Sequence, residues 1–364
     1  MSSFLVFAFF VVVQLVLGHS PQRAGDQLPL TEFEAAPQTW LEKYGRQIDQ
    51  PFSGPLAFSH LPYTRCLENE EELFDIAILG IPFDTGKLLL VPSLLSNLIP
   101  FQAYHTVQGK FPTNIRTISS TCVFAPKLLT VATFQVNPFD NALAVDQMEV
   151  AYSTLPLTLT QKLAKGGVNH PRIVSLGGDH TIVWTYGPIS VIHFDAHLSK
   201  VTHGTFFHLA QQEGLMTNTS IHAGIRCKLG VEDLDNDESV GFQLISTDDI
   251  DDLGVSEIIR RIRHRVGTSP VYLSLDIDVI DPGIAPASKA GGWTTRELKR
   301  IIRGLAGLNF VGADLVEVSP AYDVAEVTAI AAADLVHDFL SMFLSEEPPH
   351  SHPRTRRVPP KDEL

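Results

Sequence analysis

Short apolar runs alternate with amphipathic stretches along most of this chain, beginning at Phe74. Five of the apolar runs predict buried strands, at residues 74–83, 172–178, 190–197, 271–278 and 310–318. Three further stretches predict helices, at residues 256–267, 294–305 and 325–344. Thr294 and Glu297 have the spacing of a capping box at the start of the second helix. Strands that alternate with helices predict an α/β fold in which helices cover both faces of a mostly parallel sheet.

The two ends of the chain carry segments of a different kind. Residues 1–19 are apolar with small residues near their end, and they predict a secretory signal peptide. As a helix its apolar part, residues 4–18, would span about 22 Å, short of the roughly 30 Å hydrocarbon core, and a short membrane anchor is the alternative. Residues 361–364 read KDEL, the retrieval signal of the endoplasmic reticulum. Together the two ends predict a protein of the reticulum lumen with no membrane attachment after signal cleavage.

Composition and charge indicate how the rest of the chain is organised and which kinds of partner it could bind. Residues 20–70 predict an N-terminal extension over the main domain, which spans residues 71–345, and residues 346–364 predict a disordered tail. The net charge of −14 argues against a nucleic-acid partner and agrees with a cationic ligand. Three cysteines are too few for a disulfide framework, and Asn218 begins a glycosylation sequon.

Four of the predicted strands end in ionisable residues, which are Asp179, His180, Asp195, His197, Asp276, Asp278 and Glu317. The D-x-H and D-x-D pairs stand at i and i+2, so both side chains of a pair leave the same face of a strand. Ligands of parallel sheets bind beyond the carboxyl ends of the strands. Grouped acids and imidazoles are costly without a cation, and this donor set suits manganese, zinc or iron. His193 faces the same way as Asp195, and a satisfied core histidine is its alternative interpretation.

Six motifs resemble those of the ureohydrolase family, which includes arginases and agmatinases. They are GGDH, HFDAH, HGT, SLDIDVIDP, AGGWTTREL and EVSPAYD, spread over roughly residues 60–340, and they are most similar to fungal-type agmatinases. The resemblance implies a three-layer α/β/α fold of the arginase and deacetylase kind, two manganese ions per chain, and a homo-oligomer. It also implies a reaction in which metal-activated water attacks a guanidinium carbon and releases urea and an amine.

The same resemblance assigns the metal ligands. His180 would bind one manganese ion and His197 the other, Asp195 and Asp276 would bridge the two, and Asp278 would join the ion of His197.

Two further roles follow from the resemblance, and Asp278 is counted among the catalytic residues as well. His203 would be the proton shuttle to the leaving amine, with a plain loop histidine as the alternative. Glu317 would pair with the guanidinium of a small cationic substrate, because a carboxylate matches that planar donor. A structural acid at the strand end is the alternative for Glu317.

The chain departs from the family pattern in blocks. Ser199 stands where the family has a metal-binding aspartate, so the ion of His180 is expected to keep three protein ligands and to bind more weakly. Residues 87–100 are unrelated to the family, residues 177–188 form a short link, the loop between His197 and His203 is short, and residues 285–292 lack the expected turn. Contiguous changes indicate altered exon joining, either a splice form or a faulty gene model, which transcript sequencing would decide.

Three hypotheses about function follow. The first is a hydrolase of a guanidino compound, most of all agmatine, with 4-guanidinobutyrate or another guanidino acid as alternatives. The second is a catalytically impaired metal-binding protein of the same fold, because Ser199 removes a ligand. The third is a single-zinc amide hydrolase of the deacetylase type, against which the SLDIDVIDP, HGT and EVSPAYD motifs argue.

Overall fold

A computed structural model describes the regions that build one α/β domain. The described residues are 39–46, 63–64, 67, 74–81, 128–131, 141–155, 172–178, 180, 188–198, 207, 210–319 and 322–348. The predicted signal peptide, residues 87–100 and the KDEL sequence lie outside them.

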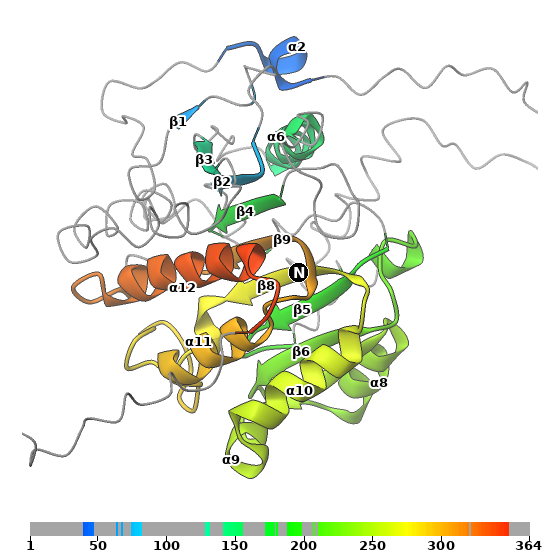
Figure 1. Cartoon of the computed structure of the whole chain (residues 1–364), viewed down its shortest axis with the longest axis vertical. Helices are drawn as coiled ribbons and strands as arrows, with labels where there is room; N and C mark the ends of the chain where they lie inside the picture. Colours follow the sequence, from blue (N-terminus) through cyan, green and yellow to red (C-terminus); the bar gives the residue numbers. More distant parts are fainter. Residues whose placement is uncertain are drawn as a thin grey trace, which may run out of the picture.

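Within the described residues, nine parallel strands form one sheet in the order β1-β3-β2-β4-β9-β8-β5-β6-β7 (Figure 1). Their bounds are β1 Tyr63–Thr64, β2 Ile76–Ile81, β3 Leu128–Val131, β4 Arg172–Gly177, β5 Ser190–Phe194, β6 Ser220–Ile225, β7 Phe242–Ser246, β8 Pro270–Asp276 and β9 Asn309–Val316. β1 and β3 are short and lie at one edge, so the other seven strands make up the body of the sheet. The predicted parallel sheet is confirmed.

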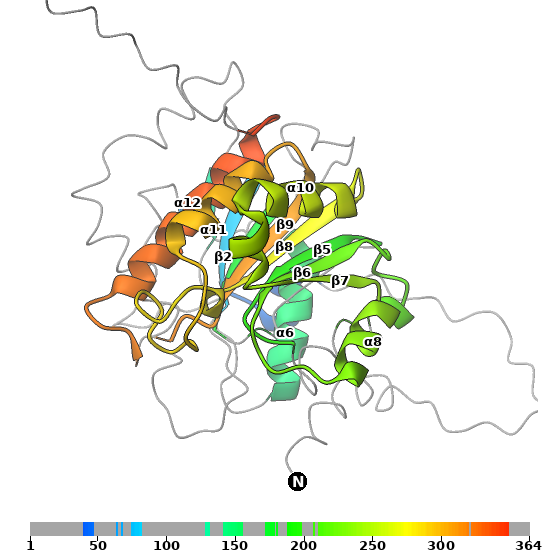
Figure 2. The same cartoon turned by 90° about the horizontal axis from the view of Figure 1, so that it is seen from below.

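Helices cover both faces of the sheet and give three layers (Figures 1 and 2). On one face lie α10 (Val255–Val266), α11 (Thr295–Gly304) and α12 (Val327–Leu344), and on the other lie α2 (Trp40–Tyr44), α6 (Asn141–Thr154) and α8 (Val231–Ser239). Neighbouring side chains of β2 serve opposite faces, since Ile78 packs in the cluster of α10–α12 and Leu79 packs in the cluster of α2 and α6. The three-layer prediction is therefore confirmed. Two short elements, α9 (Asp249–Leu253) and the 3₁₀ helix η4 (Ile277–Val279), complete the described helices.

The predicted elements lie within three residues of the observed ones at each end. The capping box of α11 is present, because Thr294 Oγ1 accepts a hydrogen bond from Glu297 N and Glu297 Oε2 accepts one from Thr294 N. α12 is apolar and long enough to cross a membrane, with a mean hydropathy of 1.5, yet 61% of it is buried. It packs against α11 and β9 as a core helix.

Two strands of the body, β6 and β7, were not among the predicted elements. Polar residues interrupt their apolar pattern, as His222 does in β6 and Gln243 does in β7. β4 and β5 follow each other in the sequence, yet β9 and β8 lie between them in the sheet.

Candidate metal centre

The ionisable residues converge because their strands are neighbours in space. β4, β9, β8 and β5 are four consecutive strands of the sheet, although β4 and β9 are far apart in the chain. Their parallel direction brings the four carboxyl ends to one edge. His180 follows β4, Glu317 follows β9, and Asp276 ends β8. Asp195 and His197 follow β5, so all of the predicted ligand-bearing strand ends meet at this edge.

One group of donors is almost completely buried. His180 Nδ1 lies 3.5 Å from Asp195 Oδ2 and 3.5 Å from Asp276 Oδ2. His180, Asp195 and Asp276 are 3%, 2% and 4% exposed. His193 joins this group, with its Nε2 at 3.3 Å from Asp195 Oδ2. A buried imidazole that faces carboxylate oxygens at these spacings is a set of donors suited to a divalent cation.

A second group lies beside the first and is more open to solvent. His197 Nδ1 lies 2.8 Å from Asp278 Oδ2 and 3.5 Å from Asp195 Oδ1. Asp195 therefore faces imidazoles with both of its oxygens, His180 and His193 with Oδ2 and His197 with Oδ1. This is the arrangement that a carboxylate shared by two cations requires.

Backbone hydrogen bonds fix the three carboxylates. Asp195 Oδ1 accepts from the amide of His197 at 2.6 Å, and Asp276 Oδ1 accepts from the amide of Asp278 at 2.8 Å. Asp278 Oδ1 accepts from the amide of Ala196 at 2.9 Å, which ties the end of β5 to η4. In Asp276 and Asp278 the Oδ2 atom is left toward the imidazoles, so the acids are oriented by the backbone before any ion binds.

The repulsion among the buried acids of this cluster favours the binding of a cation. Burial raises the pKa of Asp276 well above its usual value, and the neighbouring carboxylates of Asp195, Asp278 and Glu317 raise it further. The pKa of Asp278 is lowered instead, because hydrogen bonds from His197 and from the amide of Ala196 outweigh its burial. Hydrogen bonds to Asp195 and Asp278 raise the pKa of His197 to about 9. A divalent ion would remove the repulsion among these acids, so the residues present fit one.

A hydrogen-bond relay that was not predicted orients His180. His180 Nε2 lies 2.7 Å from Ser274 Oγ, and Ser274 Oγ donates to Asp314 Oδ1 at 3.0 Å. Because the Ser274 proton goes to Asp314, the hydroxyl oxygen accepts from His180 Nε2–H, and the lone pair of Nδ1 faces Asp195 and Asp276. Burial raises the pKa of Asp314 to about 7 despite hydrogen bonds from Tyr272, Ser274 and the amide of Leu275. The sequence did hold a signal, since Ser274 stands two residues before Asp276 on the same strand face.

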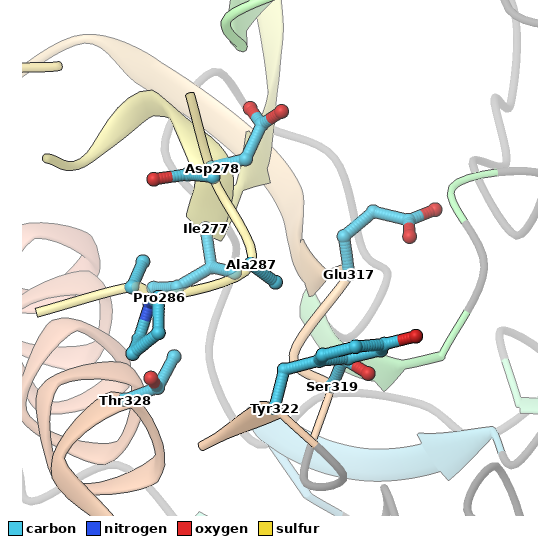
Figure 3. A pocket seen from close by; sticks show the side chains of 10 residues that line it. Ile277, Asp278, Pro286, Ala287, Glu317, Ser319, Tyr322 and Thr328 are labelled. Atoms are coloured by element: carbon cyan, nitrogen blue, oxygen red, sulfur yellow. The ribbon is translucent and has the colours of Figure 1, made fainter. Parts of the chain in front are cut away.

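Glu317 occupies the end of β9 with a left-handed backbone, at φ 61°. That conformation costs an ordinary residue about 1–2 kcal/mol, and two hydrogen bonds hold it. The amide of Glu317 donates to Gly178 O at 2.8 Å, and its Oε1 accepts from the amide of His180 at 2.9 Å. A pocket beside the metal donors is lined by Asp278, Glu317, Tyr322 and the 285–288 loop (Figure 3). Glu317 thus reaches both the metal centre and an adjoining cavity.

The loop that departs from the family pattern is tied to this pocket. Arg226 donates from Nη2 to Asp278 O at 2.6 Å and to Lys289 O at 2.7 Å. Thr328 Oγ1 donates to Ile284 O at 2.8 Å, and Asp323 caps α12 by accepting from the amides of Thr328 and Ala329. The altered loop is therefore held against the same strand end that carries Asp278.

Of the predicted site residues, His180, Asp195, His197, Asp276, Asp278 and Glu317 are brought together. His203 lies outside the described residues, as do Asp179 and Ser199. Ser274 and Asp314 are the residues that the sequence analysis did not single out.

The raised pKa of His197 gives a test of metal binding through protons. With a pKa of about 9, His197 is protonated at pH 7.5 in the metal-free protein, and it must lose that proton to bind a metal ion. We expect Mn²⁺ binding at pH 7.5 to release protons, with an affinity that rises toward pH 9. Titration calorimetry in buffers of different ionisation enthalpy measures this release, and His197→Asn should abolish its share. In the metal-free protein the stabilisation from His197 is complete below about pH 6.5 and is lost as the pH rises through about 9.

Comparisons with known proteins find similarity to the arginase family over most of the chain. The profile of the arginase family matches residues 74–341. The protein named "Putative agmatinase 1" of Schizosaccharomyces pombe is 41% identical over 334 residues, which cover 82% of this chain and 84% of that protein. An agmatinase of Chromobacterium violaceum is 29% identical over 340 residues, covering 84% of this chain and 93% of that protein. Among solved structures, proclavaminate amidino hydrolase of Streptomyces clavuligerus matches with a TM-score of 0.66 and 26% identity, covering 81% of this chain and 98% of that one.

Proposed function

Because this chain belongs to the arginase family and is an agmatinase-like ureohydrolase, we propose that it hydrolyses agmatine to urea and an amine. The observation that supports this most is the convergence of four strand ends on one group of carboxylates and imidazoles. The identity of the substrate rests on the names of similar proteins and on the pocket beside that group, whose lining includes the carboxylates of Asp278 and Glu317.

We propose manganese as the metal: His180, Asp195 and Asp276 would hold one ion, and His197, Asp195, Asp276 and Asp278 would hold the other. Bound divalent ions lower the pKa of water, so that a nucleophile is available near neutral pH.

The residues of the chain supply the remaining steps. Glu317 binds the guanidinium through its carboxylate and orients the reacting carbon toward the metal donors. Water adds to that carbon, the bond to the alkyl nitrogen breaks, and a proton reaches the leaving amine. We assign this proton transfer to His203, which follows His197 in the sequence and lies in the HGT motif.

Two alternatives to agmatine hydrolysis are each supported by a specific observation. The far end of the substrate would lie near the 285–288 loop and Tyr322, and this loop departs from the family pattern, so a guanidino acid such as 4-guanidinobutyrate is a second candidate. Ser199 supports a metal-binding protein without hydrolase activity.

The test is urea release by the manganese-soaked chain with agmatine, 4-guanidinobutyrate and arginine as substrates. Urea from agmatine supports the main proposal, and urea from a guanidino acid alone supports the second. A chain that binds manganese and releases urea from no guanidino compound would show the impaired form.

We also propose that the chain resides in the lumen of the endoplasmic reticulum, on the strength of its two end sequences. Asn218 is exposed and begins the sequon Asn-Thr-Ser, so a lumenal chain should carry a high-mannose glycan there. We expect endoglycosidase H to increase the gel mobility of the expressed chain, and Asn218→Gln to remove that shift. A mobility that endoglycosidase H leaves unchanged in the wild-type chain, and that Asn218→Gln also leaves unchanged, contradicts the proposal.

A further inference from the structure

Three hydrogen-bonded side chains, Asp237, His222 and His193, form a series that runs from α8 to the buried metal donors. Asp237 Oδ1 lies 2.9 Å from His222 Nε2, and His222 Nδ1 lies 2.6 Å from His193 Nδ1. His193 Nε2 then lies 3.3 Å from Asp195 Oδ2 and 3.2 Å from His180 Nε2. Both histidines are buried, His193 at 1% and His222 at 3% exposure. This series of side chains thus connects α8, β6 and β5 with the metal centre.

Aromatic packing holds the two histidines of this series in place. The ring of His222 stacks on Phe242 with centroids 3.8 Å apart, and His193 meets the edge of Phe207 at 5.4 Å. Both ring nitrogens of His222 are used by named partners, so its orientation is fixed by hydrogen bonds as well as by packing.

The donors and acceptors in this series of side chains indicate which nitrogen of His193 carries the proton. A carboxylate only accepts, so His222 donates from Nε2–H to Asp237. In the tautomer with its proton on Nε2, His222 offers the lone pair of Nδ1, and His193 donates to it from Nδ1–H. The lone pair of His193 Nε2 is consequently directed toward Asp195 and His180.

We infer that His193 is a ligand of the ion that His180 and Asp195 hold, an inference that rests on the proposed function. Donor atoms that share one ion stand roughly 3–3.6 Å apart, given bond lengths of about 2.0–2.2 Å. The contact of His193 Nε2 with Asp195 Oδ2, at 3.3 Å, has this spacing, as have the contacts of His180 Nδ1 with Asp195 and Asp276, at 3.5 Å. His193 lies two residues before Asp195, on the same face of β5.

This assignment explains how the chain can hold its ion without an aspartate at position 199. An imidazole from β5 supplies the fourth protein donor that the sequence lacks at Ser199. The neutral nitrogen also avoids adding a further negative charge to Asp195 and Asp276, whose carboxylates already repel each other.

The experiment is a Mn²⁺ titration of the full chain with metal analysis, comparing wild type, His193→Asn and His193→Asn/Ser199→Asp. Asparagine keeps a donor toward His222 and lacks the second ring nitrogen. We expect His193→Asn to weaken one of two manganese sites by at least about 100-fold, and the added aspartate to restore most of that loss. Ser190→Ala is the matched control, since Ser190 is equally buried at the opposite end of β5 and bonds Thr217 Oγ1 at 2.8 Å and Thr219 Oγ1 at 2.6 Å.

A measurement on the wild-type chain makes the test independent of variant folding. Pulsed electron paramagnetic resonance of the Mn²⁺-loaded chain, with ¹⁵N-labelled histidine, counts the bound imidazoles. Three imidazoles support the inference, and two overturn it while leaving the proposed function intact. Unchanged manganese affinity in folded His193→Asn overturns it as well. A wild-type chain that binds no Mn²⁺ overturns both the inference and the proposed function.

Discussion

Replacing Asp276 by asparagine is expected to abolish urea release, with kcat/KM falling by at least about 1000-fold. Asp276 is the acid that faces His180 from β8 at 3.5 Å, and it lies next to Asp195 and Asp278. An asparagine keeps the oxygen that accepts from the amide of Asp278, so the turn into η4 should persist. The loss therefore falls on metal binding, which manganese titration measures beside the urea assay.

The same variant should have the opposite effect on the metal-free protein. Burial and neighbouring acids raise the pKa of Asp276, so its ionisation destabilises the metal-free fold as the pH rises above the unfolded value of about 4. We expect metal-free Asp276→Asn to have a higher Tm than wild type at pH 8 and an equal Tm near pH 4. Asp281→Asn is the control, because Asp281 lies in the same motif and its carboxylate accepts from the amide of Gly283 at 3.0 Å. Full activity in folded Asp276→Asn would exclude the proposed metal site.

Replacing Glu317 by glutamine should reduce kcat/KM for agmatine by roughly 10- to 150-fold, the equivalent of about 1.5–3 kcal/mol for a hydrogen bond to a charged group. The amide oxygen of glutamine still accepts from the amide of His180, which Glu317 bonds at 2.9 Å. Manganese affinity should therefore change little, and the effect should appear as a higher KM.

The matched control for Glu317 is Glu238→Gln, since Glu238 is an exposed acid on α8. Equal KM values for Glu317→Gln and wild type would assign Glu317 a structural role at the strained end of β9, where its φ of 61° already needs support. A loss of manganese affinity in Glu317→Gln would instead show that the charge of Glu317 serves the metal centre.

The sequence predicts the part of this molecule that depends on local pattern. The apolar runs at β2, β4, β5, β8 and β9 mark strands because each is buried on both faces, and the D-x-H and D-x-D pairs mark the ends of two of them. Parallel strands then require that their carboxyl ends share one edge, so the pattern predicts that these acids lie along that edge. That Asp195 lies beside Asp276 depends on the pairing of β5 with β8.

Other features depend on contacts between distant segments, which a pattern of residues does not specify. The order of strands places β9 and β8 between β4 and β5, and this brings Asp314 of β9 within reach of Ser274 of β8. His222 was outside every motif, and it meets His193 only because β6 pairs with β5. The sequence therefore predicted neither the hydrogen bonds that orient His180 nor those that orient His193, because both depend on polar residues inside strands.

The central claim is that separate strand ends converge to hold a pair of divalent cations. The most direct measurement is elemental analysis of the purified full chain after soaking in Mn²⁺ and removal of unbound ions. We predict two manganese ions per chain. One ion or none per folded chain would contradict the account.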